Sequence, residues 1–267
     1  MSGKGQRLQA RTVLITGASS GLGEQIAYEA AKQGASVILT ARRSDRLHIV
    51  AGRCRELSGT EAWCYQLDLG NPEQVARVLD TIIKDVGRID VLVNNAGFGL
   101  FAEAVDTPDE VTEQMFRVNV VSLIQITRQL AAEMKNAGSG HVINIASQAG
   151  KIATPKSAVY AATKFAVRGY SNALRLELKP FGINVTCVNI GPMHTDFFNH
   201  ADPGGSYLTR IERWVLDPKA VAKKVVDCML TDRREINLPR MMEIGARLYV
   251  LFPRIGDYIT STLFNRK

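Results

Sequence analysis

The chain has 267 residues, of which 46% are hydrophobic and 22% are charged, and its formal net charge at pH 7 is +7. This length and composition predict a single globular domain, residues 1–267, with a sizeable core. The basic residues are scattered instead of gathered into runs, so we expect no nucleic-acid partner.

Short apolar runs alternate with longer helical patterns along the chain. The runs are continuous rather than alternating, which is typical of a parallel sheet covered by helices on both faces. Prolines that directly follow capping residues mark helix starts at Asn71, Thr107, Thr154 and Asp217. The order predicts an α/β fold with one doubly wound parallel sheet and ligands at the carboxyl ends of its strands. The expected strands lie at residues 12–16, 36–41, 62–67, 90–95, 141–146 and 183–189.

The first expected strand runs into the glycine-rich sequence TGASSGLG. Gly17, Gly21 and Gly23 permit a tight turn and a close approach of the backbone to a ligand. A helix starting at about Gly21 would point its free N–H groups and positive dipole end at a pyrophosphate. The spacing is G-x-x-x-G-x-G, not the usual G-x-G-x-x-G. A turn without a ligand is the alternative, but the strand before it and the helix after it favour a dinucleotide.

The second expected strand ends in LTARR, where folds that prefer NAD place an acidic residue for the ribose 2′-hydroxyl. Here Ala41 and Arg42 take that place, and a guanidinium can hold a 2′-phosphate with two charge-assisted hydrogen bonds. We therefore predict a preference for NADP(H), with NAD(H) as the alternative. Arg42 is the expected main contact, and Arg43 and Ser20 are its helpers. Two solvated arginines at a helix start are the other interpretation.

The later strand ends carry further polar and small residues. Asp68 could accept a hydrogen bond from the adenine amino group or help to cap the following helix. The small residues of NNAG, residues 95–97, would let the chain pass close to the ribose and adenine. After the sixth strand, Pro192 turns the chain, and Thr195 could hold a carboxamide.

Tyr160 and Lys164 lie four residues apart in SAVYAATKF, on one face of an expected helix. A free tyrosine has a pKa of about 10 and is a poor acid–base catalyst near neutrality. A fixed positive charge nearby favours the phenolate, so Lys164 is expected to lower that pKa. A surface pair is the alternative for so short a motif.

Taken together, these motifs resemble the short-chain dehydrogenase/reductase family over roughly residues 10 to 240. The likeness is carried by TGASSGLG, NNAG, Asn119 in FRVNVVS, Ser147 before YAATK, and GP followed by a threonine. It implies a seven-stranded Rossmann-type sheet in the order 3-2-1-4-5-6-7 and a catalytic tetrad of Asn119, Ser147, Tyr160 and Lys164. Tyr160 would exchange a proton with the substrate oxygen, and Ser147 would orient that oxygen. Lys164 would hold the ribose and lower the tyrosine pKa, and Asn119 would hold a water that relays protons.

The resemblance and the strand-end residues together define one expected reaction. Hydride would pass between the nicotinamide and a small carbonyl or alcohol, with a lipid or acyl-thioester ketone as the runner-up substrate. A non-catalytic NADP-binding sensor or interaction protein is the alternative from a different class. The family also implies a homodimer or homotetramer, formed through helices at about 108–136 and 155–180. The expected cofactor-binding residues are Gly17, Ser19, Ser20, Gly21, Leu22, Gly23, Arg42, Arg43, Asp68, Leu69, Asn95, Ala96, Gly97, Tyr160, Lys164, Pro192 and Thr195.

Two late segments are expected to shape the substrate pocket. Residues 192–214 form a long connection that is typical of a lid. Residues 240–267 extend the chain with aromatic and aliphatic residues that could form a membrane-surface helix. Because Pro253 and Asp257 interrupt their pattern, packing over the pocket or on a second subunit is favoured, and membrane contact is not expected. Phe197, Phe198 and Trp214 could line an apolar pocket or equally pack against the body of the fold. Further pocket candidates are Phe98, Phe101 and Gln148.

The cysteines, the histidines and the amino terminus bear on the cellular compartment and on whether the protein binds a metal. Four cysteines without a C-x-x-C spacing indicate reduced thiols, and with no apolar leader at the start we expect a cytoplasmic protein. His194 and His200 are the closest histidine pair and lack a helical ligand spacing, so no metal site is expected. No run of eighteen apolar residues occurs, so no spanning helix is expected either.

Overall fold

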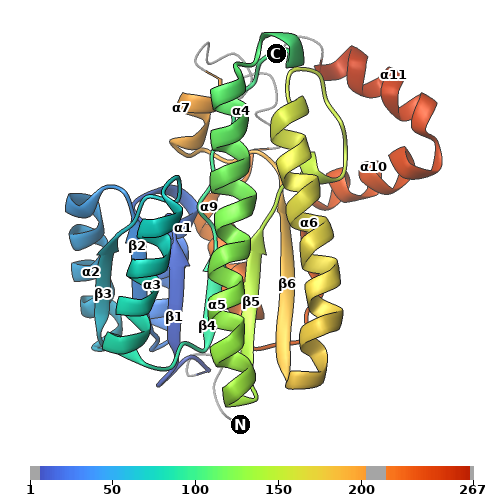
Figure 1. The fold of residues 1–267 in the computed structure, drawn as a ribbon. Helices are drawn as coiled ribbons and strands as arrows, with labels where there is room; N and C mark the ends of the chain where they lie inside the picture. Colours follow the sequence, from blue (N-terminus) through green and yellow to red (C-terminus); the bar gives the residue numbers. More distant parts are fainter. Residues whose placement is uncertain (1–6, 203–214, 265–267) are drawn as a thin grey trace.

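A computed structural model of the protein describes residues 7–202 and 215–264. Its centre is a seven-stranded sheet in the order β3-β2-β1-β4-β5-β6-β7, in which every neighbouring pair of strands is parallel (Figure 1). The predicted fold class and strand order are confirmed. The strands are β1 Thr12–Thr16, β2 Ser36–Ala41, β3 Ala62–Gln66, β4 Val91–Asn94, β5 Gly140–Ile145, β6 Ile183–Ile190 and β7 Glu235–Leu238.

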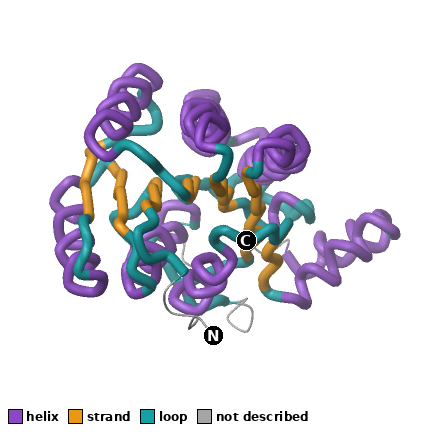
Figure 2. The backbone as a smooth tube through the Cα atoms, turned by 90° about the horizontal axis from the view of Figure 1, so that it is seen from below, coloured by secondary structure: helices purple, strands orange, loops and turns teal. Residues whose placement is uncertain are grey.

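Helices cover both faces of this sheet, as its continuous apolar strands require (Figure 2). Helices α1, α2 and α9 enclose one core with the sheet, and α3, α5 and α6 enclose the other. Val13 and Ile15 face the first core, whereas Leu14 between them faces the second. The helices are α1 Gly21–Lys32, α2 Ser44–Ser58, α3 Pro72–Val86, α4 Asp109–Phe116, α5 Ser122–Ala137, α6 Ala158–Leu178, α7 Phe197–Ala201 and α9 Pro218–Cys228.

Two of the four predicted helix caps are present. The Asn71 side chain accepts a hydrogen bond from the Gln74 N–H, and the Asp217 side chain accepts one from Lys219. The other two predictions are wrong. The Thr107 hydroxyl donates to the Glu103 carbonyl, and α4 begins after Pro108 without a side-chain cap. Helix α6 begins only after Ser157, because the turn that contains Thr154 precedes it.

The carboxyl-terminal extension forms two helices, α10 Arg240–Leu251 and α11 Pro253–Phe264, which we call the C-terminal hairpin. It follows β7 at the edge of the sheet and reaches outward from the body of the fold (Figure 1). Pro253 begins the second helix, so the break in the apolar pattern is the turn of a hairpin. Among residues 7–202 and 215–264, none of the helices combines the length and apolar character that crossing a bilayer requires.

Candidate active site

A cavity of about 1470 Å³ lies at the carboxyl ends of the strands and is lined by the residues that directly follow them. Its glycine side, as we call it, consists of Gly17, residues 19–22, Arg42, Arg43 and residues 95–97. Its aromatic side consists of Phe101, Tyr160, Phe197, Phe198 and part of the C-terminal hairpin. Parallel strands bring these ends to one edge of the sheet, which is why one cavity contains residues so distant in sequence.

The glycine side is a tight turn clamped by the strand-end sequence NNAG. Gly17 has a φ of +66°, and a Cβ there would lie 2.8 Å from the Ala96 Cα, so no larger residue fits without a backbone shift. The Asn95 amide donates to the Thr16 and Gly17 carbonyls at 2.9 and 3.2 Å. A Cβ at Gly23 would meet the Gly17 oxygen at 2.4 Å. The glycines therefore let two loops and the start of α1 pack together at the cavity wall.

Arg43 holds the outer edge of this turn. Its guanidinium donates to the Ser20 and Ser19 hydroxyls at 2.7 and 3.3 Å and lies 4.0 Å from the Asp196 carboxylate. The Ser20 side chain makes no capping hydrogen bond to α1. The first two residues of α1, Gly21 and Leu22, line the cavity. Arg42 is exposed and also lines the cavity. The structure thus places Arg43, the expected helper, and not Arg42, in contact with the glycine turn.

The remaining expected cofactor contacts also line the cavity. Asp68 accepts a hydrogen bond from the Gly70 N–H at 2.9 Å and is exposed, while Asn71 caps the following helix. The Asp68 side chain thus shapes the loop after β3 and is not the cap of α3. Thr195 lies against the glycine turn, 3.4 Å from where a Cβ of Gly21 would lie. The cavity lining also includes Leu69 and Pro192.

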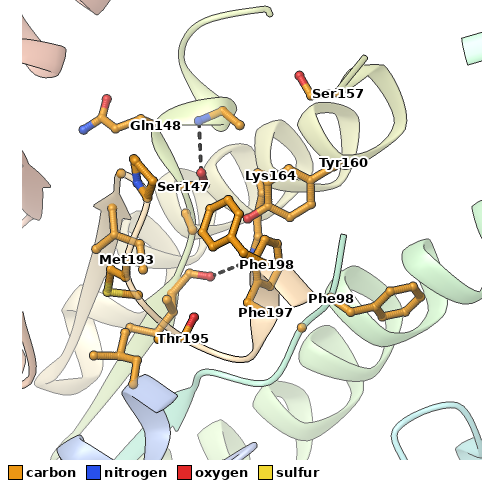
Figure 3. A pocket seen from close by; sticks show the side chains of 18 of the residues that line it. Phe98, Ser147, Gln148, Ser157, Tyr160, Lys164, Met193, Thr195, Phe197 and Phe198 are labelled. Atoms are coloured by element: carbon orange, nitrogen blue, oxygen red, sulfur yellow. Dashed lines mark hydrogen bonds between the residues drawn. The ribbon is translucent and has the colours of Figure 1, made fainter. Parts of the chain in front are cut away.

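Tyr160 points into the cavity from the first turn of α6, toward Ser147 at the end of β5 (Figure 3). Only 8% of Tyr160 is exposed. Burial raises the pKa of the phenol to about 12, although a hydrogen bond with Ser147 acts in the opposite direction. The Ser147 hydroxyl also accepts the Ala149 N–H at 3.1 Å, which fixes it at the start of a short 3₁₀ turn. The phenol is therefore protonated at neutral pH.

Lys164 lies one turn further along α6 and is almost fully buried. Its ammonium donates to the Ile145 carbonyl at 3.0 Å and lies 5.7 Å from the centre of the Tyr160 ring. Burial lowers the pKa of Lys164 to about 8. Burial favours the neutral form of both groups. The expectation that Lys164 lowers the pKa of Tyr160 stays a prediction.

Asn119 occupies a π-helical turn, residues Arg117–Val121, between α4 and α5. It is only 1% exposed, so it is not the ordinary polar residue of a long helix. Its side-chain oxygen accepts the Phe98 N–H at 3.0 Å, and its nitrogen donates to the Phe98 carbonyl and the Thr163 hydroxyl at 2.8 and 3.1 Å. Asn119 therefore anchors the loop after β4 to α6, and the water relay stays a prediction.

Four aromatic rings form the opposite wall. The Tyr160 ring centre is 5.5 Å from that of Phe197 and 6.3 Å from that of Phe101. Phe198 completes the group at 5.2 Å from Phe197 and 6.0 Å from Phe101. The ring of Phe98 instead points away from Tyr160, although Phe98 is also one of the residues that line the cavity (Figure 3).

Gln148, another pocket candidate, also lines the cavity. The Gln148 side chain points away from Ser147, and its amide nitrogen donates to the Asn189 and Leu238 carbonyls at 3.1 and 3.4 Å. It thus joins the Ser147 loop to β6 and β7. Trp214 and residues 203–214 of the expected lid lie outside the described residues. The described part of that segment includes α7, which brings Phe197 and Phe198 to the cavity.

The sequence matches a known protein family over most of its length. The model of the short chain dehydrogenase family matches residues 11–204. The chain belongs to this family. It is 32% identical over 247 residues to the 17-beta-hydroxysteroid dehydrogenase 13 of Rattus norvegicus, covering 91% of this chain and 79% of the relative. Family membership supports an oxidoreductase acting on CH–OH or C=O groups.

Solved structures of short-chain dehydrogenases agree with this placement. The enzyme from Sphingobium yanoikuyae in complex with NADPH has a TM-score of 0.79 and 29% identity, covering 90% of this chain and 95% of its own. NAD⁺-bound xylitol dehydrogenase has a TM-score of 0.78 and 25% identity, covering 87% and 99%. These neighbours support a nicotinamide cofactor for this short-chain dehydrogenase.

The glycine side fits such a cofactor. The first turn of α1 and Arg43 meet at one wall, which gives N–H donors and positive charge for phosphate groups. The clamped turn leaves no room there for larger side chains. A dinucleotide could therefore lie along this side with its reactive end toward Tyr160 and Ser147, as all these residues line one cavity.

Sequence reasoning missed several residues of this short-chain dehydrogenase that hold the site. Lys151, buried four residues after Ser147, donates to Glu235, Asn237 and Glu243 at 3.0, 2.8 and 2.7 Å. It ties the Ser147 loop to β7 and α10. The sequence shows only that a lysine follows the Ser147 segment, and it does not show which carboxylates that lysine pairs with. Also missed were the cavity-lining residues of the C-terminal hairpin, Met241, Met242, Gly245, Leu248, Tyr249, Phe252, Ile255, Gly256, Ile259 and Thr260.

Proposed function

We propose that the protein is an NADP(H)-dependent oxidoreductase that transfers hydride between the nicotinamide and a carbonyl or alcohol substrate. One observation carries this proposal. The Tyr160 phenol is buried and protonated, bonds with Ser147, and lies in the same cavity as the glycine turn. A bound nicotinamide supplies the hydride that reduction of a carbonyl carbon requires.

The protein groups handle the oxygen of the substrate and the geometry of the site. Tyr160 donates its proton to the carbonyl oxygen as that oxygen gains negative charge, because the phenol is protonated at neutral pH and lines the cavity together with Ser147. Ser147, fixed by the Ala149 N–H, hydrogen-bonds the same oxygen and orients it. The buried amine of Lys164 is the proposed hydrogen-bond donor to the nicotinamide ribose. Asn119 fixes the loop after β4 through its hydrogen bond to the Phe98 carbonyl. We also propose that residues 1–267 form one domain.

NADP(H) is the proposed cofactor because positive charge lies where the adenosine ribose is expected. Arg42 and Arg43 follow β2 directly, and no acidic residue takes their place at the strand end. Arg43 reaches the turn through Ser20, so its guanidinium and the N-terminus of α1 can hold a phosphate together. The similar solved structures support either cofactor, since they include complexes with NADPH and with NAD⁺. The preference for NADP(H) therefore rests on the residues of this chain.

A second candidate substrate, a lipid or other long apolar ketone, is favoured by one observation. The aromatic side and the hairpin line the cavity with Phe101, Phe197, Leu248, Phe252 and Ile255. Binding is favourable when an apolar substrate removes such a wall from water, whereas a small polar carbonyl would leave much of the wall exposed to water.

The test is oxidation of NADPH by a panel of aldehydes, diketones, steroids, long-chain ketones and acyl thioesters. Tyr160→Phe is expected to lower turnover by about 10²–10⁴-fold, the usual contribution of a general acid, while NADPH binding measured by fluorescence stays unchanged. Tyr65→Phe is the matched control, because the Tyr65 hydroxyl bonds Asp85 outside the cavity. Normal reduction by Tyr160→Phe would refute its role. NADPH binding by the wild type without turnover of any carbonyl would favour a sensor.

A further inference from the structure

Helix α10 presents an exposed apolar stripe, by which we mean Met241, Ile244, Leu248 and Leu251. Their exposed fractions are 61%, 52%, 52% and 69%. The spacing of three, four and three residues places them on one face of the helix. The opposite face holds α10 to the body, because Ala246 is buried there and Glu243 accepts the Lys151 hydrogen bond. The stripe therefore lies on the side of α10 that faces away from these contacts with the body of the fold.

Helix α11 continues this apolar surface. Phe252, Ile255, Tyr258 and Ile259 are between 47% and 72% exposed, and none of residues 253–262 is buried. Its main partner is α10, where Gly256 lies against the Tyr249 ring. A lone helix of this length is marginal in water, so its stability depends on a surface that covers its apolar side. Such a large exposed apolar area marks a contact site.

The charges around the stripe indicate what covers it. Arg240, Arg247 and Arg254 are all exposed on the hairpin. Its two acidic residues are already engaged, Glu243 by Lys151 and Arg247, and Asp257 by the Tyr249 hydroxyl at 2.7 Å. Asp257 is also two residues from both Ile255 and Ile259, hence on the other side of α11, and does not interrupt the apolar face. An apolar face flanked by arginines matches the acyl and headgroup layers of an anionic lipid surface.

The cavity opens through the same surface. Leu248, Phe252, Ile255 and Ile259 line the cavity and are also about half exposed to solvent, so they form its rim. A second copy of the chain packed on the stripe would cover this rim. A lipid surface covers the same side chains and is itself a reservoir of apolar molecules, which suits the apolar wall inside.

We propose that the C-terminal hairpin docks on an anionic lipid surface and holds the mouth of the cavity against it. Docking itself does not depend on catalysis. Its consequence, that apolar carbonyl substrates enter from the lipid, rests on the proposed oxidoreductase function. The hairpin lies on the surface and does not cross it, in keeping with the length of its helices.

The experiment is flotation of the full chain with phosphatidylcholine vesicles, with and without a minority of phosphatidylglycerol. The wild type is expected to float with the anionic vesicles and much less with the neutral ones. The double variant Ile244→Ser/Leu251→Ser should lower the bound fraction about ten-fold, since both side chains lose their burial in lipid. Neither residue lines the cavity, so reduction of a water-soluble carbonyl should be unchanged. Ile49→Ser, on α2 and 59% exposed, is the matched control and should bind as the wild type does.

Two outcomes would overturn the proposal. One is a wild type that stays unbound with both vesicle types. The other is a wild-type dimer in light scattering that the double variant converts to a monomer, which would assign the stripe to a second copy. Tyr160→Phe should still float, so a failure of docking and a failure of the proposed catalysis are read separately.

Discussion

The glycine side of the cavity is built by short segments that each follow a strand, whereas the aromatic side is assembled from segments far apart in the chain. On the first side, the Asn95 amide donates to the Gly17 carbonyl, and Arg43 donates to the Ser19 and Ser20 hydroxyls. On the second side, Phe101, Tyr160, Phe197 and the hairpin meet only because the fold brings them together. The first surface is polar and fixed by the backbone, and the second is apolar and fixed by packing.

This difference separates a surface that is fixed by backbone geometry from one that is fixed by the packing of side chains. A turn that requires glycine at Gly17 and Gly23 admits few alternatives, so a cofactor site of this kind is set by local geometry. An apolar wall tolerates many combinations of side chains of similar volume, so it can be adapted to different substrates. Predictions that disturb one side and not the other therefore test whether the two sides are separable.

The largest effect on stability is expected at Lys151, whose ion pairs with Glu235 and Glu243 join α10 to the body of the fold. Lys151→Met removes the buried cation that pairs with Glu235 and Glu243 and leaves two carboxylates with little solvent access. Breaking such a pair costs about 3–5 kcal/mol of unfolding free energy, measured by denaturant titration. KM for an apolar carbonyl should rise as α10 shifts, while NADPH affinity stays near that of the wild type.

Lys32→Met is the control for this substitution. Lys32 pairs with Glu29 on an exposed helix face, so its loss should cost less than about 1 kcal/mol. If Lys151→Met were no more costly than Lys32→Met, the hairpin would not depend on this ion pair. A fall in NADPH affinity equal to the rise in KM would show that the two sides are not separable.

A smaller effect is expected at Lys164, where the two sides meet. Its pKa falls from 10.5 to about 8 on folding, so the folded state disfavours the ammonium that the unfolded chain keeps. The penalty is complete below pH 8 and is relieved as pH rises from 8 to 10.5. In the cofactor-free protein, Lys164→Met should therefore be about 1–3 kcal/mol more stable than the wild type at pH 7, allowing for the lost bond to Ile145.

The pH dependence makes this prediction specific. The stability difference between Lys164→Met and the wild type should shrink between pH 8 and 10.5, as followed by thermal unfolding at each pH. A variant less stable than the wild type at pH 7, or a difference constant with pH, would mean that burial of Lys164 carries no such penalty.

The glycine side and the sheet could be predicted from the sequence because their signals are local. The apolar strands and the glycine turn each lie within eight residues, and their expected positions agree with the structure to within one residue at the strand ends. The edge strand β7 was expected only from the family resemblance, since EINL alternates and is short. The pKa of Tyr160 could not be predicted, because it depends on burial by Phe101 and Phe197, which are far away in the sequence. For the same reason the Lys151 contacts and the individual hairpin residues that line the cavity could not be predicted, although the sequence favoured packing of this segment over the pocket or on a second subunit.

The smallest expected effect distinguishes the two arginines of the glycine side. Arg43 contacts the turn through Ser20 and Ser19, so it is the better placed to hold a 2′-phosphate, although the sequence ranks Arg42 first. Arg43→Gln should weaken NADPH about ten-fold, the loss of one charge-assisted hydrogen bond, and leave NADH nearly unchanged. Arg42→Gln, next to it and likewise exposed, should change NADPH affinity less.

Fluorescence titration of both cofactors with the three proteins gives the comparison directly. If Arg42→Gln costs more than Arg43→Gln, the order expected from the sequence is right and Arg43 mainly supports the turn. If the wild type binds NADPH and NADH equally, the positive charge at the end of β2 does not select the cofactor. Turnover of a bound carbonyl at saturating NADPH should be the same in all three proteins, because neither arginine touches the aromatic rings around Tyr160. A changed turnover would mean that the glycine side also positions the reacting groups.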